Sequence, residues 1–344
     1  MATVKPANLA GVMDRVCDIR TDVWPSKFEV VDEEGIFRLL HYIPVKARKY
    51  RTPILMVYAF INRPYILDLR KDISVVDKYL NAGFDVYMID WGYPTGADRY
   101  LNLDDYIDFL DKSVENIKKR NEVDQVTVHG YCLGGTLSTA YAAIRPRNLR
   151  SLLLQATPID FNTNNTLAVW ARSLDPDKVV EAQGVATGAF LNAGFLLVDP
   201  MNLIAGKYET FLETLDSDEA MTSFLCMDRW IFDSPAIPGD AFRQYIRQWY
   251  QQNLLVRGQF QALGEAVDLK NIGCPLLVLS AQYDHIAPPE STRVLLDLVS
   301  SRDKEEFSVG KGHIGITTSP TLHREFWPKV VGWMEEHSER IPAR

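Results

Sequence analysis

The feature that most constrains the fold is a run of apolar and β-branched residues leading into a glycine-flanked cysteine, Val126-Thr-Val-His-Gly-Tyr-Cys-Leu-Gly-Gly135. The small and apolar residues 136–143 follow it and suit a helix. This order predicts a strand, a sharp turn at Cys132 and a helix. Glycines two residues before and after the cysteine let neighbouring segments approach a strained turn without a clash of Cβ atoms.

The spacing Gly130-x-Cys132-x-Gly134 is that of a nucleophile elbow, with cysteine where serine is more usual. The helix after the turn directs free N–H groups and its positive end at the thiol, and so supplies a donor for an oxyanion. The alternative for so short a pattern is a small, inert core thiol. The choice depends on whether the rest of the chain supplies a base and an acid.

Segments typical of strands and helices alternate along the first half of the chain. Residues 27–32 and 35–43 alternate in polarity across a turn, which predicts an antiparallel pair at a sheet edge. Further strands are expected at 53–59, 84–90, 126–131 and 150–157, and helices at 72–82 and 104–119. By the connection rules, this alternation predicts an α/β fold with a mostly parallel, doubly wound sheet.

The alternation stops between about residues 160 and 269, where helical periods and three tryptophans occur with few strand signals. It resumes with a strand at 275–284, a helix from about 289, a short strand near 306–309 and a last helix at 322–336. We therefore expect a core in two parts, 1–159 (with a lead-in to about 26) and 270–344. Residues 160–269 would form a helical cap over an active site at the carboxyl ends of the strands.

A thiol nucleophile needs a base, and the base needs an acid that orients it. In α/β hydrolases these residues follow in the order nucleophile, acid, histidine. Downstream of Cys132, Asp284 ends a predicted strand, and His313 lies in a glycine-rich loop before the last helix. We predict a Cys132-His313-Asp284 triad in an α/β-hydrolase fold.

The oxyanion hole is expected to consist of two backbone N–H groups. One is that of Leu133, directly after the nucleophile. The other comes from the loop after Ala59, from Phe60 or Ile61.

The other five histidines are weighed against His313. His285 is the rival, but it neighbours Asp284, and consecutive side chains leaving a strand diverge. His129 lies on the strand of the nucleophile and is expected to be a hydrogen-bonded core residue. The remaining three are expected to be surface or packing residues, the last two in an exposed-looking terminal helix and tail: His41, His323 and His337.

Composition limits the partners. The net charge of −8 argues against nucleic acid, which needs a basic face. The cysteines Cys17, Cys132, Cys226 and Cys274 are far apart without a C-x-x-C pair, so neither a metal site nor a disulfide framework is predicted. No run of signal-peptide type begins the chain, and a reducing cytoplasm is the expected compartment.

Residues 182–198 lack charged side chains and contain the apolar segment 195–198. The run is shorter than the roughly 20 apolar residues that a spanning helix needs, and polar residues interrupt it. We expect no transmembrane span, and instead a buried or interfacial helix whose apolar residues Phe195 to Val198 contact a second copy or a partner.

Five motifs in this order resemble the polyhydroxyalkanoate synthases, and the likeness extends over most of the chain from about residue 50. They are Ala59-Phe-Ile-Asn-Arg-Pro-Tyr-Ile-Leu-Asp-Leu69, Gly83-Phe-Asp-Val-Tyr-Met-Ile-Asp-Trp-Gly92, Gly130-Tyr-Cys-Leu-Gly-Gly135, Tyr283-Asp-His-Ile-Ala-Pro-Pro289 and Gly312-His-Ile-Gly315. The length is similar to the short catalytic subunit of the two-subunit, class III-like enzymes. Tyr131 and Leu133 look closer to the single-subunit class.

The resemblance implies an acyltransferase that polymerises a (3R)-hydroxyacyl coenzyme A, with 3-hydroxybutyryl-CoA expected, and releases CoA. His313 would deprotonate Cys132, and Asp284 would orient His313 or help to activate the incoming hydroxyl. No cofactor is expected, because the CoA thioester is a substrate. The implied partners are the growing polyester chain and either a second copy or a second synthase subunit, at the surface of cytoplasmic polyester granules.

Two other functions fit the same residues. A cysteine-nucleophile hydrolase, of the dienelactone-hydrolase or polyester-depolymerase type, would use the same triad with water as the acceptor. A non-catalytic granule-surface subunit would not depend on Cys132.

Overall fold

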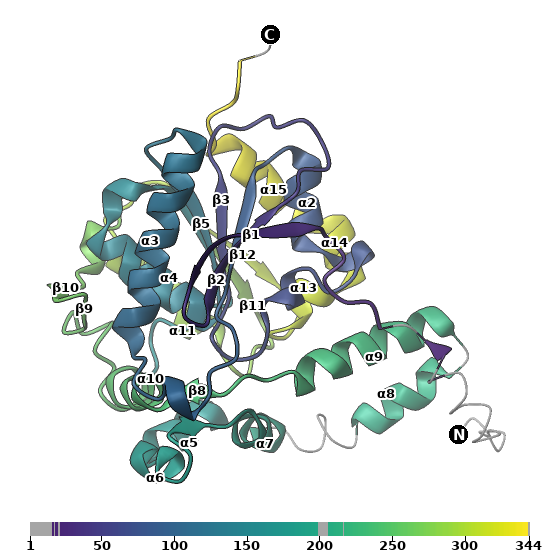
Figure 1. Cartoon of the computed structure of the whole chain (residues 1–344), viewed down its shortest axis with the longest axis vertical. Helices are drawn as coiled ribbons and strands as arrows, with labels where there is room; N and C mark the ends of the chain where they lie inside the picture. The colour runs from purple at the N-terminus through teal and green to yellow at the C-terminus, as the bar shows by residue number, and fades with distance from the viewer. Residues whose placement is uncertain (1–15, 17, 20, 199–205, 216, 343–344) are drawn as a thin grey trace.

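The computed structural model describes residues 16, 18–19, 21–198, 206–215 and 217–342. Its centre is an eight-stranded sheet in the order β1-β2-β4-β3-β5-β6-β11-β12 (Figure 1). The strands are β1 Phe28–Glu34, β2 Phe37–Tyr42, β3 Ile54–Val57, β4 Val86–Asp90, β5 Val126–Tyr131, β6 Leu149–Gln155, β11 Leu276–Ala281 and β12 Lys304–Val309. β1 and β2 pair antiparallel at one edge, and the strands from β4 to β12 are parallel to one another. The predicted α/β sheet with an antiparallel edge pair is confirmed.

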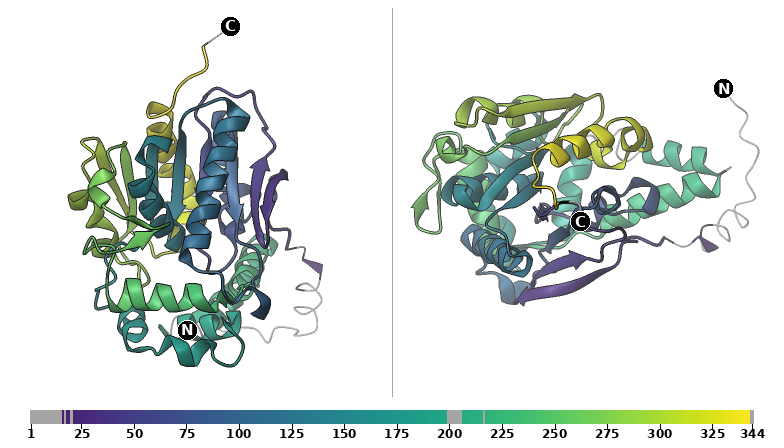
Figure 2. Two further views of the ribbon diagram at one scale, coloured as in Figure 1. Left: turned by 60° about the vertical axis from the view of Figure 1, so that its left-hand side comes forward. Right: turned by 90° about the horizontal axis from the view of Figure 1, so that it is seen from above.

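Helices cover both faces of the sheet, which explains the continuous apolar runs of β3 and β5 (Figure 2). On one face α2 (Val75–Ala82) packs beside α15 (Trp327–Glu336), and on the other α3 (Leu103–Asn121) packs beside α4 (Leu133–Ile144). The remaining C-terminal helices are α11 Pro289–Arg293, α12 Leu295–Leu298, α13 Gly315–Thr318 and α14 Pro320–Glu325. Short 3-10 turns occur at η1 Pro64–Leu67, η2 Lys71–Ile73, η3 Gly96–Asp98, η4 Pro146–Asn148 and η7 Leu269–Asn271.

Local capping determines where these helices begin. The helix expected from residue 72 starts as α2 only at Val75, because the Ser74 side chain accepts the N–H of Asp77 and caps the helix there. α2 ends at Gly83, whose φ of 97° suits glycine. α3 begins after Asn102, which forms a reciprocal capping box with Asp105.

Residues 160–269 are called the cap below. Their helices lie at the end of the sheet where the parallel strands finish, whereas the hairpin at residues 261–266 flanks α3 and α4 (Figure 1). Their elements are α5 Thr166–Ser173, α6 Pro176–Val180, β7 Val185–Ala186, α7 Gly188–Val198, α8 Gly206–Thr214, α9 Asp218–Phe232, β8 Ile237–Pro238, α10 Gly239–Gln244, the π-helical η6 Tyr245–Gln251, β9 Gln261–Ala262 and β10 Glu265–Ala266. α8 and α9 lie side by side and extend away from the other cap helices (Figures 1 and 2). That the cap is a domain of its own remains a prediction.

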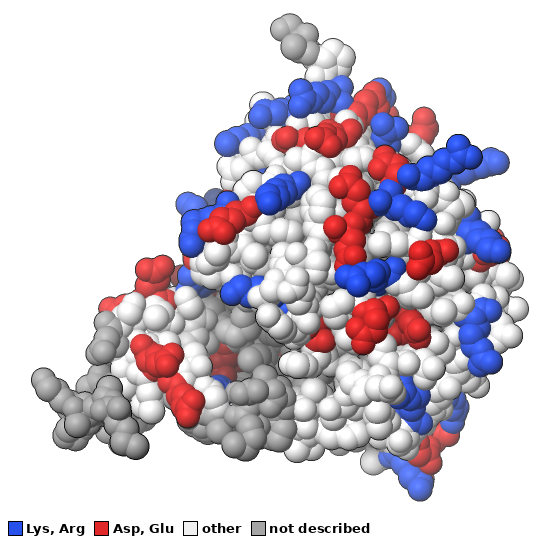
Figure 3. Space-filling view, turned by 180° about the vertical axis from the view of Figure 1, so that it is seen from behind, with Lys and Arg blue, Asp and Glu red and all other residues white. Residues whose placement is uncertain are grey.

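The apolar segment 188–198 forms α7, in which only Leu191 is buried. In the parts of the chain that the structure describes, no helix has both the length and the apolar character needed to cross a membrane. On the face shown in Figure 3, lysine and arginine are interspersed with aspartate and glutamate rather than gathered into one basic area.

Candidate active site

Cys132 lies on a strained turn between β5 and α4. Its φ of 53° and ψ of −131° are unusual for a residue with a side chain. The turn is held by the N–H of Cys132, which donates to the Gln155 carbonyl at 3.0 Å, and by the N–H groups of Gly135 and Thr136, which donate to the Cys132 carbonyl. The thiol therefore sits at the amino end of α4, where the predicted strand, turn and helix meet.

The glycines around Cys132 are required by close backbone contacts. A Cβ atom on Gly130 would lie 2.5 Å from the Cα of Gly135, and one on Gly134 would lie 2.3 Å from the carbonyl oxygen of Val57. Both distances are too short for non-bonded atoms, so the G-x-C-x-G pattern reflects the packing of α4 against β3 and β5.

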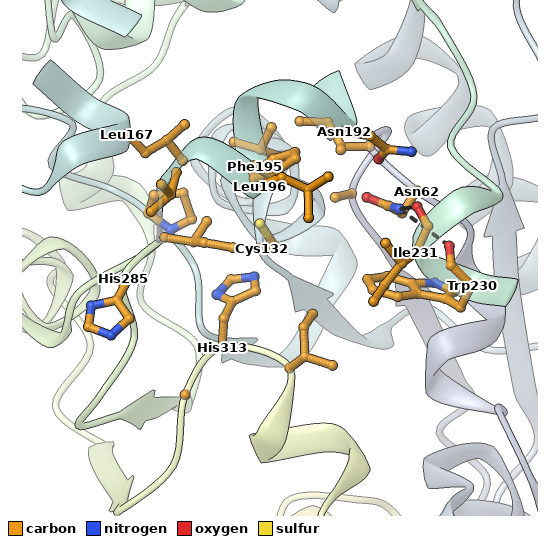
Figure 4. A pocket seen from close by; sticks show the side chains of 18 of the residues that line it. Asn62, Cys132, Leu167, Asn192, Phe195, Leu196, Trp230, Ile231, His285 and His313 are labelled. Carbon is orange, nitrogen blue, oxygen red and sulfur yellow. Dashed lines mark hydrogen bonds between the residues drawn. The ribbon is translucent and has the colours of Figure 1, made fainter. Parts of the chain in front are cut away.

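His313 and Asp284 form a buried pair next to the thiol. The Nδ1 of His313 donates to the Oδ2 of Asp284 at 2.7 Å. The other carboxylate oxygen accepts the N–H groups of Ile286 and Ala287, each at 2.8 Å. The Tyr131 hydroxyl also donates to the His313 carbonyl at 2.9 Å. With Nδ1 occupied, Nε2 faces the cavity, and Figure 4 shows the ring directed at Cys132.

The charges around His313 favour its protonated form. Burial lowers the pKa of His313, but the negative charge of Asp284 and that of Cys132 in its thiolate form, with the hydrogen bonds to both residues, outweigh burial and raise the pKa to about 10. The imidazole can therefore take a proton from the thiol and hold it, which is the property that a base for a thiol nucleophile needs.

Cys132 and His313 open into a cavity of about 370 Å³, a typical size for a ligand site. The cavity lies between core and cap, because the loops after β3, β5 and β11 line it together with residues of α7 and α9, and its walls are mostly apolar (Figure 4). Within the described ranges, no three His, Cys, Asp or Glu side chains are grouped to hold a metal ion.

The predicted oxyanion residues lie around the same cavity. Leu133 and Ile61 line it, whereas the Phe60 side chain packs inward against Tyr106 and Tyr245. In the described part of the chain, the N–H groups of Leu133, Phe60 and Ile61 donate to no acceptor. Their role stays a prediction.

The other histidines are placed as follows. His285 lines the cavity but lies farther from Cys132 than His313 does (Figure 4). His129 is buried between the Tyr79 hydroxyl and the Gln155 amide, each at 3.1 Å, and burial lowers its pKa to about 4. Of the two positions expected for His323, surface or packing, the structure shows packing, although its helix looked exposed in the sequence. Its side chain is 3% exposed, because it stacks on Trp327 and bonds the Thr317 carbonyl.

His41 and His337 are only partly buried. His41 lies between Asp85 and Glu29, at 2.7 and 3.3 Å. His337 contacts Asp303 at 3.1 Å. Neither lies at the cavity.

Sequence reasoning did not single out Tyr245 and Tyr250, which line the cavity from the cap. They are five residues apart, and they belong to the π-helical stretch η6, whose hydrogen bonds close from residue i to i+5. The π-helix therefore brings onto one face two side chains that an α-helix would separate. The only signal in the sequence was the density of aromatic residues around Trp249.

Comparison with known proteins agrees with this geometry. The sequence profile of the alpha/beta hydrolase fold matches residues 52–320, and that of the poly-beta-hydroxybutyrate polymerase (PhaC) N-terminus matches residues 13–80. Among solved structures, the monoacylglycerol lipase of Paleococcus ferrophilus has a TM-score of 0.50 at 18% identity, covering 86% of this chain and 100% of the lipase. A thermophilic esterase from Thermogutta terrifontis has a TM-score of 0.52 at 15% identity, covering 90% and 98%. The predicted α/β-hydrolase fold is confirmed.

Curated relatives cover nearly the whole chain. The poly(3-hydroxyalkanoate) polymerase subunit PhaC of Thiocystis violacea is 38% identical over 93% of this chain and 90% of its own length. The subunit of the same name from Allochromatium vinosum is 42% identical over 83% and 81%. That of Haloferax mediterranei is 40% identical over 90% of this chain but 64% of its own length. The chain therefore belongs to the family of the poly(3-hydroxyalkanoate) polymerase subunits PhaC, as its motifs indicated.

Proposed function

We propose that this protein is an acyltransferase that polymerises (3R)-hydroxyacyl-CoA, 3-hydroxybutyryl-CoA in the first instance, into polyhydroxyalkanoate and releases CoA. The observation that carries the proposal is the thiol of Cys132 on its elbow, faced by a histidine whose Nδ1 is fixed by Asp284 at 2.7 Å. The names of the relatives point to the same reaction.

In the first half-reaction, His313 takes the proton of Cys132, and the thiolate attacks the carbonyl carbon of the thioester. The negative charge on the carbonyl oxygen is stabilised by the N–H of Leu133 and by that of Phe60 or Ile61. The carbon–sulfur bond to CoA then breaks, His313 protonates the leaving thiolate, and an acyl-cysteine remains.

In the second half-reaction, a 3-hydroxyl group attacks the acyl-cysteine. His313 accepts the hydroxyl proton directly, or Asp284 assists it, and the Cys132 thiolate leaves. An oxoester forms, and the chain grows by one unit. Exchange of one thioester for another is nearly balanced, so a cysteine intermediate stays reactive toward an alcohol.

Water would divert the acyl-cysteine to a free acid, so the site must exclude it. The cap supplies apolar cover, with Phe195, Leu196 and Ile231 among the residues that line the cavity. A hydrolase with the same triad is the second candidate, because the solved structures that share the fold include lipases and esterases.

We also propose binding partners and a cellular location for the protein. The polyester chain is the product, and association with a second copy or with a second synthase subunit is proposed. We also place the reaction at the surface of granules in the cytoplasm, because the polyester product is poorly soluble in water. The net charge of −8 argues against nucleic acid as a partner.

Incubation of the purified protein with 3-hydroxybutyryl-CoA tests the proposal by measuring released CoA thiol and insoluble polymer. We expect both from the wild type and neither from Cys132→Ala, while Cys274→Ala, which removes a thiol away from the cavity, retains both. CoA with free 3-hydroxybutyrate and no polymer would instead identify a hydrolase. Absence of CoA release, from the wild type and with any second subunit added, would favour the non-catalytic role.

A further inference from the structure

A series of hydrogen-bonded polar side chains joins the loop after β3 to the cap. Asn62 follows Ile61 in that loop and has a left-handed backbone, with φ of 60°. Its Nδ2 donates to the Ser234 hydroxyl at 2.7 Å, and that hydroxyl donates to the Oδ1 of Asn192 at 2.7 Å. Asn192 belongs to α7, which packs directly on this segment, since a Cβ on Gly188 would lie 1.9 Å from the Ser234 carbonyl oxygen.

These contacts determine which way the Asn62 amide faces. Its Nδ2 also lies 3.3 Å from the Ile231 carbonyl oxygen and 3.4 Å from that of Trp230. Carbonyl oxygens only accept, so an amide turned the other way would place its own oxygen against them. The Oδ1 of Asn62 must therefore face away from α9, and Figure 4 shows it on the side of Cys132.

That oxygen has no donor of its own in the described part of the chain, where all the hydrogen bonds of the Asn62 side chain are made by Nδ2. Asn62 lines the cavity of Cys132, whose mostly apolar wall also includes the side chains of Ile61, Leu196 and Ile231. An unpaired acceptor in an apolar wall favours a ligand that brings a hydrogen-bond donor to that point.

The position of Asn62 indicates which donor this is. It directly follows the loop residues Phe60 and Ile61, proposed to bind the carbonyl oxygen of the thioester. In a 3-hydroxyacyl group the hydroxyl lies on the second carbon from that carbonyl. A polar group next to the oxyanion loop and lining the same cavity, as Asn62 is, is therefore the candidate to bind it. The polyester backbone, by contrast, offers only acceptors along its length.

We propose that the Oδ1 of Asn62 accepts a hydrogen bond from the 3-hydroxyl of the acyl group that reacts with Cys132. Asn62 thereby selects 3-hydroxyacyl thioesters over thioesters that lack this hydroxyl. The inference rests on the proposed function and adds a specificity-determining residue to it. The tether through Ser234 and Asn192 fixes the amide for this task.

Single-turnover mixing, with enzyme in excess over thioester, tests the inference. The rate of CoA release is compared between 3-hydroxybutyryl-CoA and butyryl-CoA, which differ only in the hydroxyl. We expect the wild type to prefer the hydroxyacyl thioester by about tenfold, the effect of one hydrogen bond. Asn62→Gly, which tolerates the left-handed backbone, should abolish the preference by slowing only the hydroxyacyl thioester.

Two variants distinguish binding of the 3-hydroxyl by Asn62 from a role of Asn62 in holding the loop. Asn62→Asp keeps an acceptor at the cavity and the left-handed backbone, so it should retain the preference, although its second carboxylate oxygen meets the carbonyls of Trp230 and Ile231 and should slow both thioesters. Ser234→Ala removes the tether, but the carbonyls of Trp230 and Ile231 still orient the Asn62 amide, so the variant should retain the preference even if both rates fall. Ser234 does not itself line the cavity.

Several outcomes would overturn the assignment. A wild type without preference for the hydroxyl contradicts it regardless of any variant. Equal slowing of both thioesters in Asn62→Gly would mean that Asn62 supports the loop or binds an amide of the CoA arm, which both thioesters carry. If instead neither thioester releases CoA from the wild type, the proposed function itself fails, whereas CoA release with an unchanged preference in Asn62→Gly defeats only the role of Asn62.

Discussion

The proton on His313 links the chemistry of the site to the stability of the fold. The residue is buried, yet its pKa is raised to about 10, since the charges of Asp284 and Cys132 outweigh the effect of burial. A histidine in that state binds its proton more tightly in the folded than in the unfolded protein. Folding and protonation of His313 therefore favour each other.

This predicts a stability contribution that depends on pH. It is fully present below the unfolded pKa of 6.5 and is lost as the pH rises through about 10. The difference in the free energy of unfolding between wild type and His313→Gln should thus shrink over this window, by an amount on the order of a few kcal/mol. Urea unfolding at a series of pH values measures it.

His323 provides the matched control, because burial lowers its pKa to about 4. Folding favours the neutral form of His323. The difference in the free energy of unfolding between wild type and His323→Gln should therefore change only as the pH falls from 6.5 through about 4. A His313→Gln difference that stays constant between pH 6.5 and 10 would contradict the raised pKa.

At the residue scale, the sequence indicated the triad candidates because strand ends and chain order are local features. It did not indicate Asn62, whose importance depends on contacts with Ser234 and α9, far along the chain. It also left open whether His323 is a surface or a packing residue, since only the packing of α14 shows which way that side chain points. Contacts between distant segments are not encoded in periodicity.

The elbow between β5 and α4 is the element on which the site depends most. Gly134 meets the backbone of Val57 and Tyr58, and backbone cannot move aside as a flexible side chain can. Gly332, in α15, has open space around its missing Cβ, and there glycine only adds freedom to the unfolded chain.

Alanine substitutions at these two glycines should therefore have opposite effects. Gly134→Ala should destabilise the protein by about 3 kcal/mol or more, as overpacking against the backbone does. Gly332→Ala should stabilise it by roughly 0.5–1 kcal/mol, because alanine is the better helix former. Thermal unfolding compares them, and a Gly134→Ala protein as stable as the wild type would show that the turn relaxes more easily than its contacts imply.

Helices and strands whose apolar residues follow a clear spacing could be predicted from the sequence, and elements without such a spacing could not. The buried strands β3, β5 and β11 follow from continuous apolar runs, and α3 from its stripe of apolar residues. The π-helical η6 could not be foreseen, because its i to i+5 spacing matches neither the helical nor the strand template. That spacing is what brings Tyr245 and Tyr250 to the cavity.

Across the whole molecule, the cap connects to the core at more than one loop of the site. Asn62 joins the loop after β3 to α7 through Ser234, and Asn165, at the start of α5, donates to the His285 carbonyl at 2.7 Å, beside Asp284. Order along the chain predicted a cap between β6 and β11, but not these connections. A displacement of α5 or α7 would act on the loops that hold Asn62 and Asp284.

The outer surface of the cap also bears on association. Of the segment expected to contact a partner, Phe195, Leu196 and Val198 line the cavity, whereas Leu197 is 56% exposed. Trp170 of α5, which neighbours α7, is 41% exposed. The apolar surface available to a second copy therefore spans α5 and α7. The other residues of the segment 195–198 line the cavity instead.

Charge introduced on this surface should weaken self-association. Leu197→Glu would place a carboxylate in an apolar contact, and the cost of desolvating it should raise the dimer dissociation constant at least about tenfold. Sedimentation velocity over a range of concentrations measures this. Lys329→Glu changes charge in the same direction at an exposed position of α15, which lies away from α5 and α7 (Figure 1), and should leave association unchanged. A wild type that sediments as a monomer at every concentration would exclude the self-contact and leave α5 and α7 as a surface for a different subunit.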